Sequence, residues 1–559
     1  MPSLGEKLKL RLKQLEEIKE PYAKRDYDVA RFVNPRRELI MDSQRFDEKG
    51  DARGKDAYSG VPASALAVWA DGMQGHMVSQ SLRWFKAIMG DYRLNRIDEV
   101  QQYLQEYDEA MYGEFNRSNF YSILGEWFRD AGSVGTATLY TEEDLSKGNA
   151  VHTPIHLREI FISEDRYGNV DTVFRKFFLT AKQAVDQFGE DMLADDIVNN
   201  AQEHPEKRHE FVHAVFPNTD RMFGSLLAKD KPWKSVYMQA SPNVKKPDQY
   251  VVRESGYDIN PYAVWRLRKN SDEIYGYSPA HDVMVTIKKD QQFSKTLLEA
   301  AHLAVKPALN VPEYMRGRTR ISPNGHNYYE RGGDVIKPVQ NMGNFPIGID
   351  REERMQKFIE DAYRVEFFMI LSRAEREMTA TEIMERQAEK SVLLGPQVDR
   401  LIQEGLVKTF DIVSDIADRA GRLPEPPQIL IDSIEAGGNR KIDIRFTGPL
   451  AQAQARLFQM QPIKNGLNEL AQASVLYPQV LDKIDADRLA ERILDSTNFP
   501  QDIMRTDAEL KEKREADALA LQQAQAQEQL GQMAEAYPKI NQPVEAGSPA
   551  EMIGEQVGI

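Results

Sequence analysis

The chain has 559 residues, of which 41% are hydrophobic and 28% are charged, and its formal net charge is −15. This length exceeds what one hydrophobic core supports, so we expect several domains. The acidic balance argues against a basic protein that coats nucleic acid. The chain contains no cysteine, which excludes disulfides, thiolate zinc sites and cysteine nucleophiles. No apolar run reaches about 18 residues, so we expect no membrane span.

Residues 1–275 are expected to combine helices with an α/β region. Apolar spacing predicts helices at about 4–33, 61–79, 94–117 and 119–131, with Trp69 as a core anchor and Trp84-Phe85 as a short buried strand or turn. From about 133 to 268, short alternating runs predict strands, and residues 164–169 predict a hairpin connection. Thr180 and Gln183 form a capping-box pattern for a helix that ends at Gly189. The predicted fold class is mixed α/β and helix-rich.

The middle of the chain predicts two helices around a short excursion, followed by a longer helix. The two helices are expected at 276–304 and 349–371, with a glycine- and proline-punctuated excursion at 305–348. A polar break at 372–379 leads into a helix at 380–421, which Thr379 and Glu382 would start with a capping box. Gly395-Pro396 lies inside this helix and predicts a kink, because proline removes one backbone hydrogen bond.

The C-terminal part is expected to be mostly helical. Residues 422–448 include the strand-like run KIDIRFTG. Residues 449–536 are rich in Ala and Gln, which favour helix. Residues 537–559 contain Pro, Gly and Ser with few apolar groups, so we expect this tail to be disordered.

The search for catalytic motifs is mostly negative. The sequence has no phosphate-binding loop of the GxxxxGK[ST] type, no HExxH and no GxSxG. His209 and His213 would lie on one face of a strand, so a metal pair is conceivable there, although exposed or hydrogen-bonded histidines are commoner and no third ligand is evident. Most carboxylates lie on helix faces beside Lys or Arg, as expected for a solvated surface. We therefore predict no catalytic residues, no metal and no cofactor.

Basic residues gather in two places on this acidic chain. Between 350 and 378 they interleave with acidic residues, and the basic members include Arg351, Arg354, Lys357, Arg373 and Arg376. The excursion carries Arg316, Arg318, Arg320, Arg331 and Lys337. A salt-bridged helix surface and a solvated patch are the simpler interpretations. Docking to an acidic partner or to DNA phosphates is the functional alternative.

Three runs of the sequence resemble the portal, or head–tail connector, protein of short-tailed tailed bacteriophages. They are EREMTATEIMERQAEKSVLLGPQVDRLIQEGL at 375–406, YGYSPAHDVMVTIKKDQQFSKTLLEAAHLAVKPAL at 275–309 and IDIRFTGPLAQAQ at 442–454. The first is fairly specific, since it joins a capped helix start to a Gly-Pro step. The resemblance extends from the N-terminal helix to about residue 510.

The resemblance implies a portal subunit with named parts. Residues 1–275 would hold the N-terminal helices and the α/β wing. The stem would be 276–304 and 349–371, with the clip at 305–348 between its two helices. The long kinked helix at 380–421 and the strand region at 422–448 would belong to the wing, and 449–536 would form a helical crown or barrel.

The resemblance also implies candidate functional residues. The break at 372–379 would be a channel loop, with Ser372, Arg373, Glu375, Arg376 and Met378. The DNA-channel candidates are Arg351, Arg354, Lys357, Arg373 and Arg376. The candidates for clip docking to terminase are Arg316, Arg318, Arg320, Arg331 and Lys337.

Portal proteins are not enzymes, and the resemblance implies the following setting for this chain. It would form a homo-oligomeric ring of about twelve subunits at one capsid vertex, closed by side-to-side contacts. The ring would pass double-stranded DNA during packaging and ejection. Its partners would be the major capsid and scaffolding proteins, the terminase large subunit, and then tail adaptor and tail proteins. It would be found in the virion, and in the host cytoplasm during assembly.

Two other classes of protein remain as alternatives. One is a metal-dependent nuclease that uses carboxylates not evident as a motif, and metal-dependent cleavage of DNA would favour it. The other is a helical scaffold or internal virion protein that does not form a ring.

Overall fold

A computed structural model describes residues 3–37, 54–91, 93–225, 227–240, 250–306, 308–317, 319, 328, 336–338, 345–372, 394–435, 442–448, 461–474, 477, 479, 483–497 and 507–536. The chain divides into a first unit, Met1–Lys483, and a second unit, Ile484–Ile559. Each unit is described by itself below. The channel-loop candidates Arg373, Glu375, Arg376 and Met378, and the predicted capping box at Thr379 and Glu382, lie outside the described residues. Ser372, which was predicted to belong to the channel loop, is instead the last residue of a helix, Val365–Ser372.

The first unit is built on a helical core near its N-terminus. Helices α1 (Leu4–Phe32), α2 (Val61–Met77), α3 (Asp98–Arg117) and α4 (Phe120–Val134) agree with the predicted helices, except that 94–96 forms a separate 3₁₀ turn before α3. Trp69, Trp84 and Trp127 are fully buried here, together with Trp265 from a strand. Trp69 is therefore a core anchor, as predicted. It packs against Gly132, where a Cβ atom would come within 2.6 Å of the indole ring.

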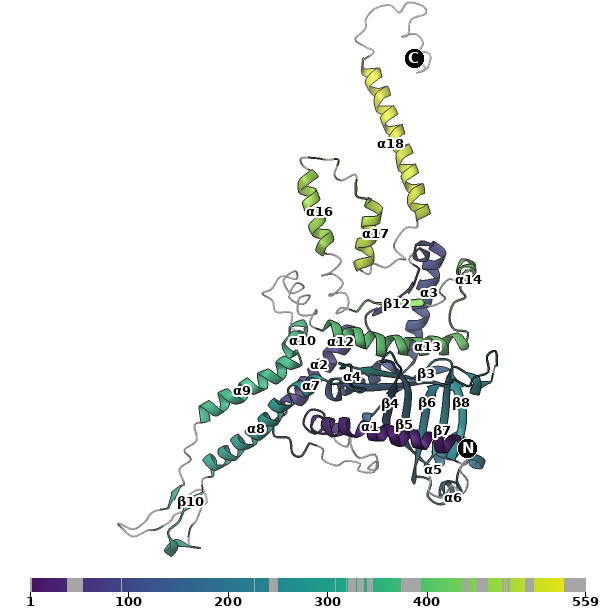
Figure 1. Ribbon diagram of the computed structural model, residues 1–559. Coiled ribbons are helices and arrows are strands. Elements are labelled where there is room, and N and C mark those ends of the chain that lie inside the picture. The colour runs from purple at the N-terminus through teal and green to yellow at the C-terminus, as the bar shows by residue number, and fades with distance from the viewer. Residues whose placement is uncertain are drawn as a thin grey trace, which may run out of the picture. The chain divides into compact units, whose positions relative to one another are not determined.

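A five-stranded antiparallel sheet has the order β4-β5-β6-β7-β8. Its strands are β4 (Ile160–Glu164), β5 (Val170–Thr180), β6 (Arg208–Pro217), β7 (Trp233–Gln239) and β8 (Val251–Tyr257). Helix α1 covers one face through Leu8, Leu12 and Leu15. Helices α5 (Ala181–Phe188) and α6 (Asp195–Glu203) cover part of the other face (Figure 1). The 164–169 hairpin and the Thr180–Gln183 capping box are confirmed, whereas α6 was not predicted.

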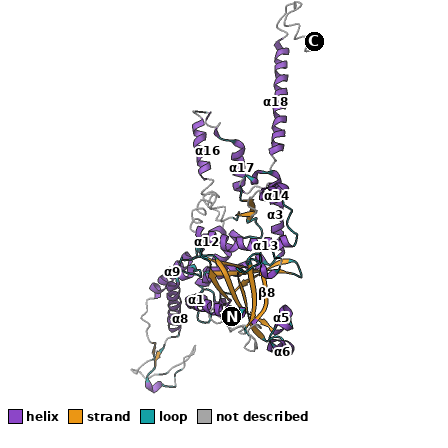
Figure 2. Cartoon of the chain, turned by 45° about the vertical axis from the view of Figure 1, so that its right-hand side comes forward, coloured by secondary structure: helices purple, strands orange, loops and turns teal. Residues whose placement is uncertain are grey.

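Two smaller sheets complete the α/β region (Figure 2). The first has the order β3-β2-β9, with β3 (Asn149–Ile155), β2 (Thr136–Asp144) and β9 (Tyr262–Arg266). The second pairs β1 (Phe85–Met89) with β12 (Ile442–Phe446). Both of these last strands were predicted, but their pairing across more than half of the chain was not.

The helix–excursion–helix arrangement is present, with different helix boundaries. The predicted 276–304 helix is divided into α7 (Pro279–Asp282) and α8 (Met284–Val305), because Ser278 caps a short first helix that ends at Val283. The predicted 349–371 helix is also wrong as a single element. It consists of α9 (Phe345–Ala362) and α10 (Val365–Ser372), separated at Arg364. Arg364 has φ +56°, a left-handed conformation that cannot continue a right-handed helix.

The long helix is also different from the prediction. Residues 380–393 lie outside the described part, so the kink predicted at Gly395-Pro396 stays a prediction; in the described part these two residues start α12 (Gly395–Arg400). Pro396 lies in the first turn, where proline's missing N–H has no helical partner to lose. A π-helix, η8 (Leu401–Leu406), and then α13 (Val407–Arg419) follow. Gly421, at φ +66°, comes just after α13, close to the predicted end.

The remaining described helices are short or polar. The first unit contains α14 (Gln428–Glu435) and α16 (Gln461–Ser474). The second unit contains α17 (Ala486–Thr497) and α18 (Asp507–Ala536), joined by an ion pair between Arg514 and Asp487. In the part of the chain that the structure describes, no helix has both the length and the hydropathy of a membrane span. The predicted disordered tail, 537–559, is outside that part.

Candidate DNA-channel and docking surfaces

Helices α8 and α9 form a hairpin that carries the excursion at its far end. The two helices lie side by side and run in opposite chain directions (Figure 1). Gly348 in α9 lies so close to α8 that a Cβ atom would come within 3.0 Å of Leu297. At the near end, Gln291 in α8 accepts hydrogen bonds from the backbone N–H groups of Tyr58 and Ser59, at 2.7 and 3.0 Å. The hairpin is therefore attached to the segment that leads into α2.

The described DNA-channel candidates lie on α9 and are exposed. Arg354 pairs with Asp350 at 3.0 Å, and both side chains are largely in solvent. Such a pair stabilises the helix by less than about 1 kcal/mol. Arg351 and Lys357 are also exposed, at three-residue steps from Arg354. These three cations are thus accessible to a ligand, while Arg373 and Arg376 lie outside the described residues.

The excursion contains a small antiparallel pair, β10 (Leu309–Asn310) with β11 (Lys337–Pro338). Lys337 lies opposite Asn310 in this pair and is exposed. Arg316 follows the 3₁₀ turn Glu313–Met315 and is exposed as well. The structure therefore places two of the five docking candidates at the far end of the helix hairpin. Arg318, Arg320 and Arg331 are outside the described residues.

The break at Arg364 attaches the hairpin to the helical core. Tyr363 is fully buried, and its hydroxyl donates a hydrogen bond to the Gly132 carbonyl at 3.1 Å. On the other side of the break, Phe368 packs directly over Gly72 of α2, where a Cβ atom would come within 2.3 Å of the ring. Residues on both sides of Arg364 therefore contact the helical core.

We expect Arg364→Gly to leave the free energy of unfolding unchanged or to raise it by up to about 1 kcal/mol, because glycine adopts a left-handed conformation without strain. Arg364→Val should lower it by roughly 1–2 kcal/mol, since a β-branched side chain fits that conformation poorly. Urea unfolding of both variants measures the difference. If valine were as stable as glycine, the left-handed break would not be part of the folded protein.

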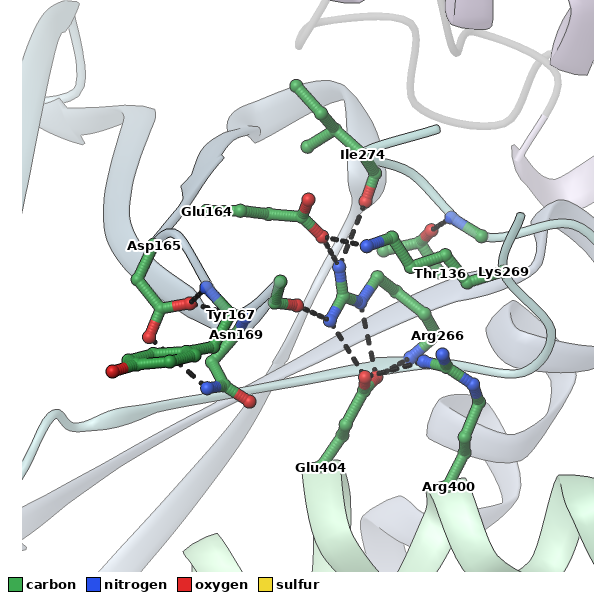
Figure 3. Close-up of polar contacts among 12 residues, drawn as sticks. Thr136, Glu164, Asp165, Tyr167, Asn169, Arg266, Lys269, Ile274, Arg400 and Glu404 are labelled. Atoms are coloured by element: carbon green, nitrogen blue, oxygen red, sulfur yellow. Dashed lines mark hydrogen bonds and ion pairs between the residues drawn. The ribbon is translucent and has the colours of Figure 1, made fainter. Parts of the chain in front are cut away.

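A buried arginine holds the long helix against the sheets (Figure 3). The Arg266 side chain is 1% exposed and donates to both carboxylate oxygens of Glu404, at 2.7 and 3.2 Å. It also contacts the Glu164 carboxylate and donates to the carbonyls of Gly168, at 2.9 Å, and Ile274, at 3.3 Å. Glu404 lies in the π-helix and accepts the Arg266 backbone N–H as well, at 2.9 Å. Strand β9, the β4–β5 hairpin and the long helix therefore meet at one guanidinium group.

This cluster was not predicted from the sequence, although one signal was available. Arg266 lies inside the apolar run YAVWRLR, where a charge needs a buried partner. Its partners Glu164 and Glu404 come from distant segments, and their own sequence surroundings are those of ordinary charged residues. Lys269 adds a further ion pair with Glu164 at 2.6 Å, and Arg400 donates to Glu404 at 2.6 Å.

Comparison with known proteins gives matches along nearly the whole chain. Residues 5–504 match the family described as bacteriophage head to tail connecting protein. This chain belongs to that family. It is 26% identical over 530 residues to the portal protein of Salmonella phage epsilon15, covering 93% of this chain and 92% of that protein. It is also 25% identical over 503 residues to the probable portal protein of Bordetella phage BPP-1, covering 88% and 87%.

The histidine pair of this connector does not form a metal site. His213 is 1% exposed, and its two ring nitrogens are 2.8 Å from the Tyr262 hydroxyl and 2.9 Å from the Ser235 hydroxyl. Its ring also stacks on Tyr237 at 4.0 Å. Both nitrogens are therefore occupied. Among the described residues, no group of three or more His, Cys, Asp or Glu side chains could hold a metal ion.

One cluster of the connector has the composition of a catalytic triad but acts as a helix cap. His281 lies 2.8 Å from Asp26 and accepts the Ser278 backbone N–H at 3.0 Å. Ser278 is fully buried, and its hydroxyl donates to the Ser133 carbonyl. A nucleophile needs an open approach and a base that accepts its hydroxyl proton. Ser278 has no open approach, and although its hydroxyl lies 3.1 Å from His281 Nδ1, it donates its proton to the Ser133 carbonyl. Ser278 and His281 together form the capping box that starts α7.

Burial lowers the pKa of His213 from 6.5 to about 3. Between these two pH values the His213 ring binds a proton in the unfolded chain but not in the folded connector. The free energy of unfolding therefore decreases as the pH falls. We expect His213 to account for a loss of roughly 2 kcal/mol between pH 7 and pH 5. Urea unfolding at both pH values should therefore show a smaller loss for His213→Gln than for wild type. The exposed His204→Gln is the matched control and should keep the wild-type difference; an equal loss in both variants would contradict the prediction.

Proposed function

We propose that this connector works as the portal of a phage capsid. In this role it would form a ring at one vertex, pass double-stranded DNA through the ring, and serve as the docking platform first for the terminase large subunit and then for tail proteins. The observation that carries the proposal is the helix hairpin with an exposed basic end, in a chain that matches the connector family over residues 5–504. The hairpin would be the stem and its far end the clip. The protein would be a component of the virion, and it would assemble in the host cytoplasm with capsid and scaffolding proteins.

The charge of the chain suits a channel through which DNA slides. A uniformly basic lumen would hold phosphates tightly, because binding strength rises with each cation that neutralises a phosphate. We propose that Arg351, Arg354 and Lys357 on α9, with Arg373 and Arg376 in the 372–379 loop, make weak contacts that neighbouring acids limit. Arg354 already has such an acid in Asp350. Particles made with Arg373→Ala and Arg376→Ala together should retain less DNA than wild type after a salt challenge, and equal retention would end the DNA-contact role.

We expect the double substitution Arg316→Glu with Lys337→Glu to weaken terminase binding about tenfold or more, because two exposed cations become anions at the far end of the hairpin. The control is Lys147→Glu with Lys182→Glu, which changes the net charge equally at exposed sites of the α/β region. A pull-down of terminase by each purified variant measures the effect. Binding that falls equally in both variants would show a response to net charge alone, and unchanged binding in the first would remove the clip assignment.

A further inference from the structure

Among the residues that the structure describes, the small β1–β12 sheet has one edge closed by side chains and one open edge. On the β1 side, side chains bond both outward backbone groups of Phe85 and of Met89 and the N–H of Ala87. Tyr112 accepts the Phe85 N–H and donates to the Phe85 carbonyl, both at 2.9 Å. Asp108 accepts the Ala87 N–H at 2.8 Å. Asn95 accepts the Met89 N–H at 2.7 Å and donates to the Met89 carbonyl at 2.8 Å. No further strand can add to β1.

The ladder between the two strands fixes which groups of β12 point away from β1. The Thr447 N–H donates to the Trp84 carbonyl at 2.8 Å, so this pair is hydrogen-bonded. In an antiparallel pair such positions alternate. Asp443 and Arg445 therefore bond to β1, while Ile442, Ile444 and Phe446 direct their N–H and C=O groups outward. Within the described chain, nothing forms a hydrogen bond with these outward groups.

Side chains also bond individual backbone groups on three other edge strands of the first unit. Asn119 bonds both the N–H and the carbonyl of His152 on β3, at 2.8 and 2.7 Å. Tyr275 accepts the Ile162 N–H of β4, and Lys19 donates to the Ile160 carbonyl of the same strand. Glu404 accepts the Arg266 N–H of β9. A strand edge whose backbone groups are not bonded, as on β12, is a template for a further strand.

We infer that an extended segment of a neighbouring copy of this chain adds to β12 when the ring forms. This inference rests on the proposed ring. A ring contact joins two different surfaces of neighbouring subunits. A sheet that can accept a further strand along only one of its edges provides one such surface. The exposed face of β12 carries Asp443 beside Arg445, so the edge is locally neutral on a chain of net charge −15. Two acidic copies can approach there without strong repulsion.

The side chains of β12 pack against the core, which holds the open edge rigidly enough for a further strand to pair with it. Ile442, Ile444 and Phe446 pack against the main hydrophobic core, which fixes the register of β12. A two-stranded sheet is marginal alone, and a third strand would complete it. The contact would consist mainly of backbone hydrogen bonds, so it would depend on amide N–H groups more than on particular side chains.

The test compares Ile444→Pro with Ile444→Ala. Both remove the isoleucine side chain, but only proline removes the outward N–H, and the bonds to β1 stay intact because they belong to Asp443 and Arg445. We expect the alanine variant to form rings and the proline variant to show about a tenfold weaker contact, as one lost hydrogen bond per interface predicts. Sedimentation of both proteins over a concentration series measures this. Equal assembly of the two variants overturns the inference but leaves the ring, whereas an alanine variant and a wild type that never form rings overturn the proposed function and the inference with it.

Amide exchange of the wild-type protein gives a second test that needs no substitution. The Asp443 and Arg445 amides should be protected in both free subunits and assembled rings, since β1 bonds them. The Ile442, Ile444 and Phe446 amides should become protected only in the ring. Fast exchange of Ile444 in the ring overturns the inference. Because the chain has no cysteine, Ile444→Cys adds a further check: a disulfide-linked dimer under oxidation would mean that β12 pairs with itself, which also overturns the inference.

Discussion

Replacing Arg266 with methionine lowers the free energy of unfolding by roughly 3–5 kcal/mol, the cost expected when one partner is removed from a buried ion pair. Methionine fills similar space, but Glu404 and Glu164 would then lose their common cation. Glu404 keeps Arg400 and Glu164 keeps Lys269, so the remaining anions are partly compensated and the protein should still fold. Urea unfolding at pH 7 measures the loss.

The control for this prediction is Arg354→Met, which breaks an exposed pair and should change the free energy of unfolding by less than about 1 kcal/mol. The double variant Arg266→Met with Glu404→Met should recover part of the loss, because it leaves one fewer buried charge. An Arg266 effect no larger than the Arg354 effect would mean that the cluster does not hold the long helix to the sheets.

Gly135→Ala should destabilise the connector by roughly 3–5 kcal/mol, for two reasons that add. Gly135 ends α4 at φ +79°, and a Cβ atom there would come within 2.4 Å of the Tyr277 backbone. That backbone leads into Ser278 and the start of α7, so the clash would displace the base of the helix hairpin. The predicted consequence is lower thermal stability together with a lower yield of assembled rings.

Gly421→Ala separates the cost of a positive φ from the cost of the close contact with the Tyr277 backbone. Gly421 also has a positive φ, +66°, but no atom lies within 4 Å of the position of its Cβ. It should therefore show only the conformational cost of about 1–2 kcal/mol. Similar losses for the two alanine variants would contradict the close approach at Tyr277.

Local signals in the sequence predicted much of this fold. The Thr180–Gln183 capping box and the 164–169 hairpin depend on residues within a few positions of each other, and both occur as predicted. The Arg364 break has no such signal, since it contains neither glycine nor proline. It exists because Tyr363 and Phe368 bind to Gly132 and Gly72, which are far away in the sequence.

Among the candidate functional surfaces, too, some features follow from the local sequence and others depend on tertiary packing. Charge spacing located Arg351, Arg354 and Lys357 on one exposed helix, because helical periodicity is local. Neither the Arg266 cluster nor the β1–β12 sheet could be assembled from local patterns. Arg266 bonds a residue 138 positions later, and Phe85 of β1 lies opposite Phe446 of β12. Only tertiary packing brings these groups together, and the open edge of β12 became visible only once its partner was known.

The mass of the purified native assembly, with negative-stain images of the same sample, tests the portal proposal most directly. We expect closed rings of about twelve times 63.8 kDa, each with a central hole. A protein that stays monomeric at high concentration and in the presence of scaffolding protein would contradict it.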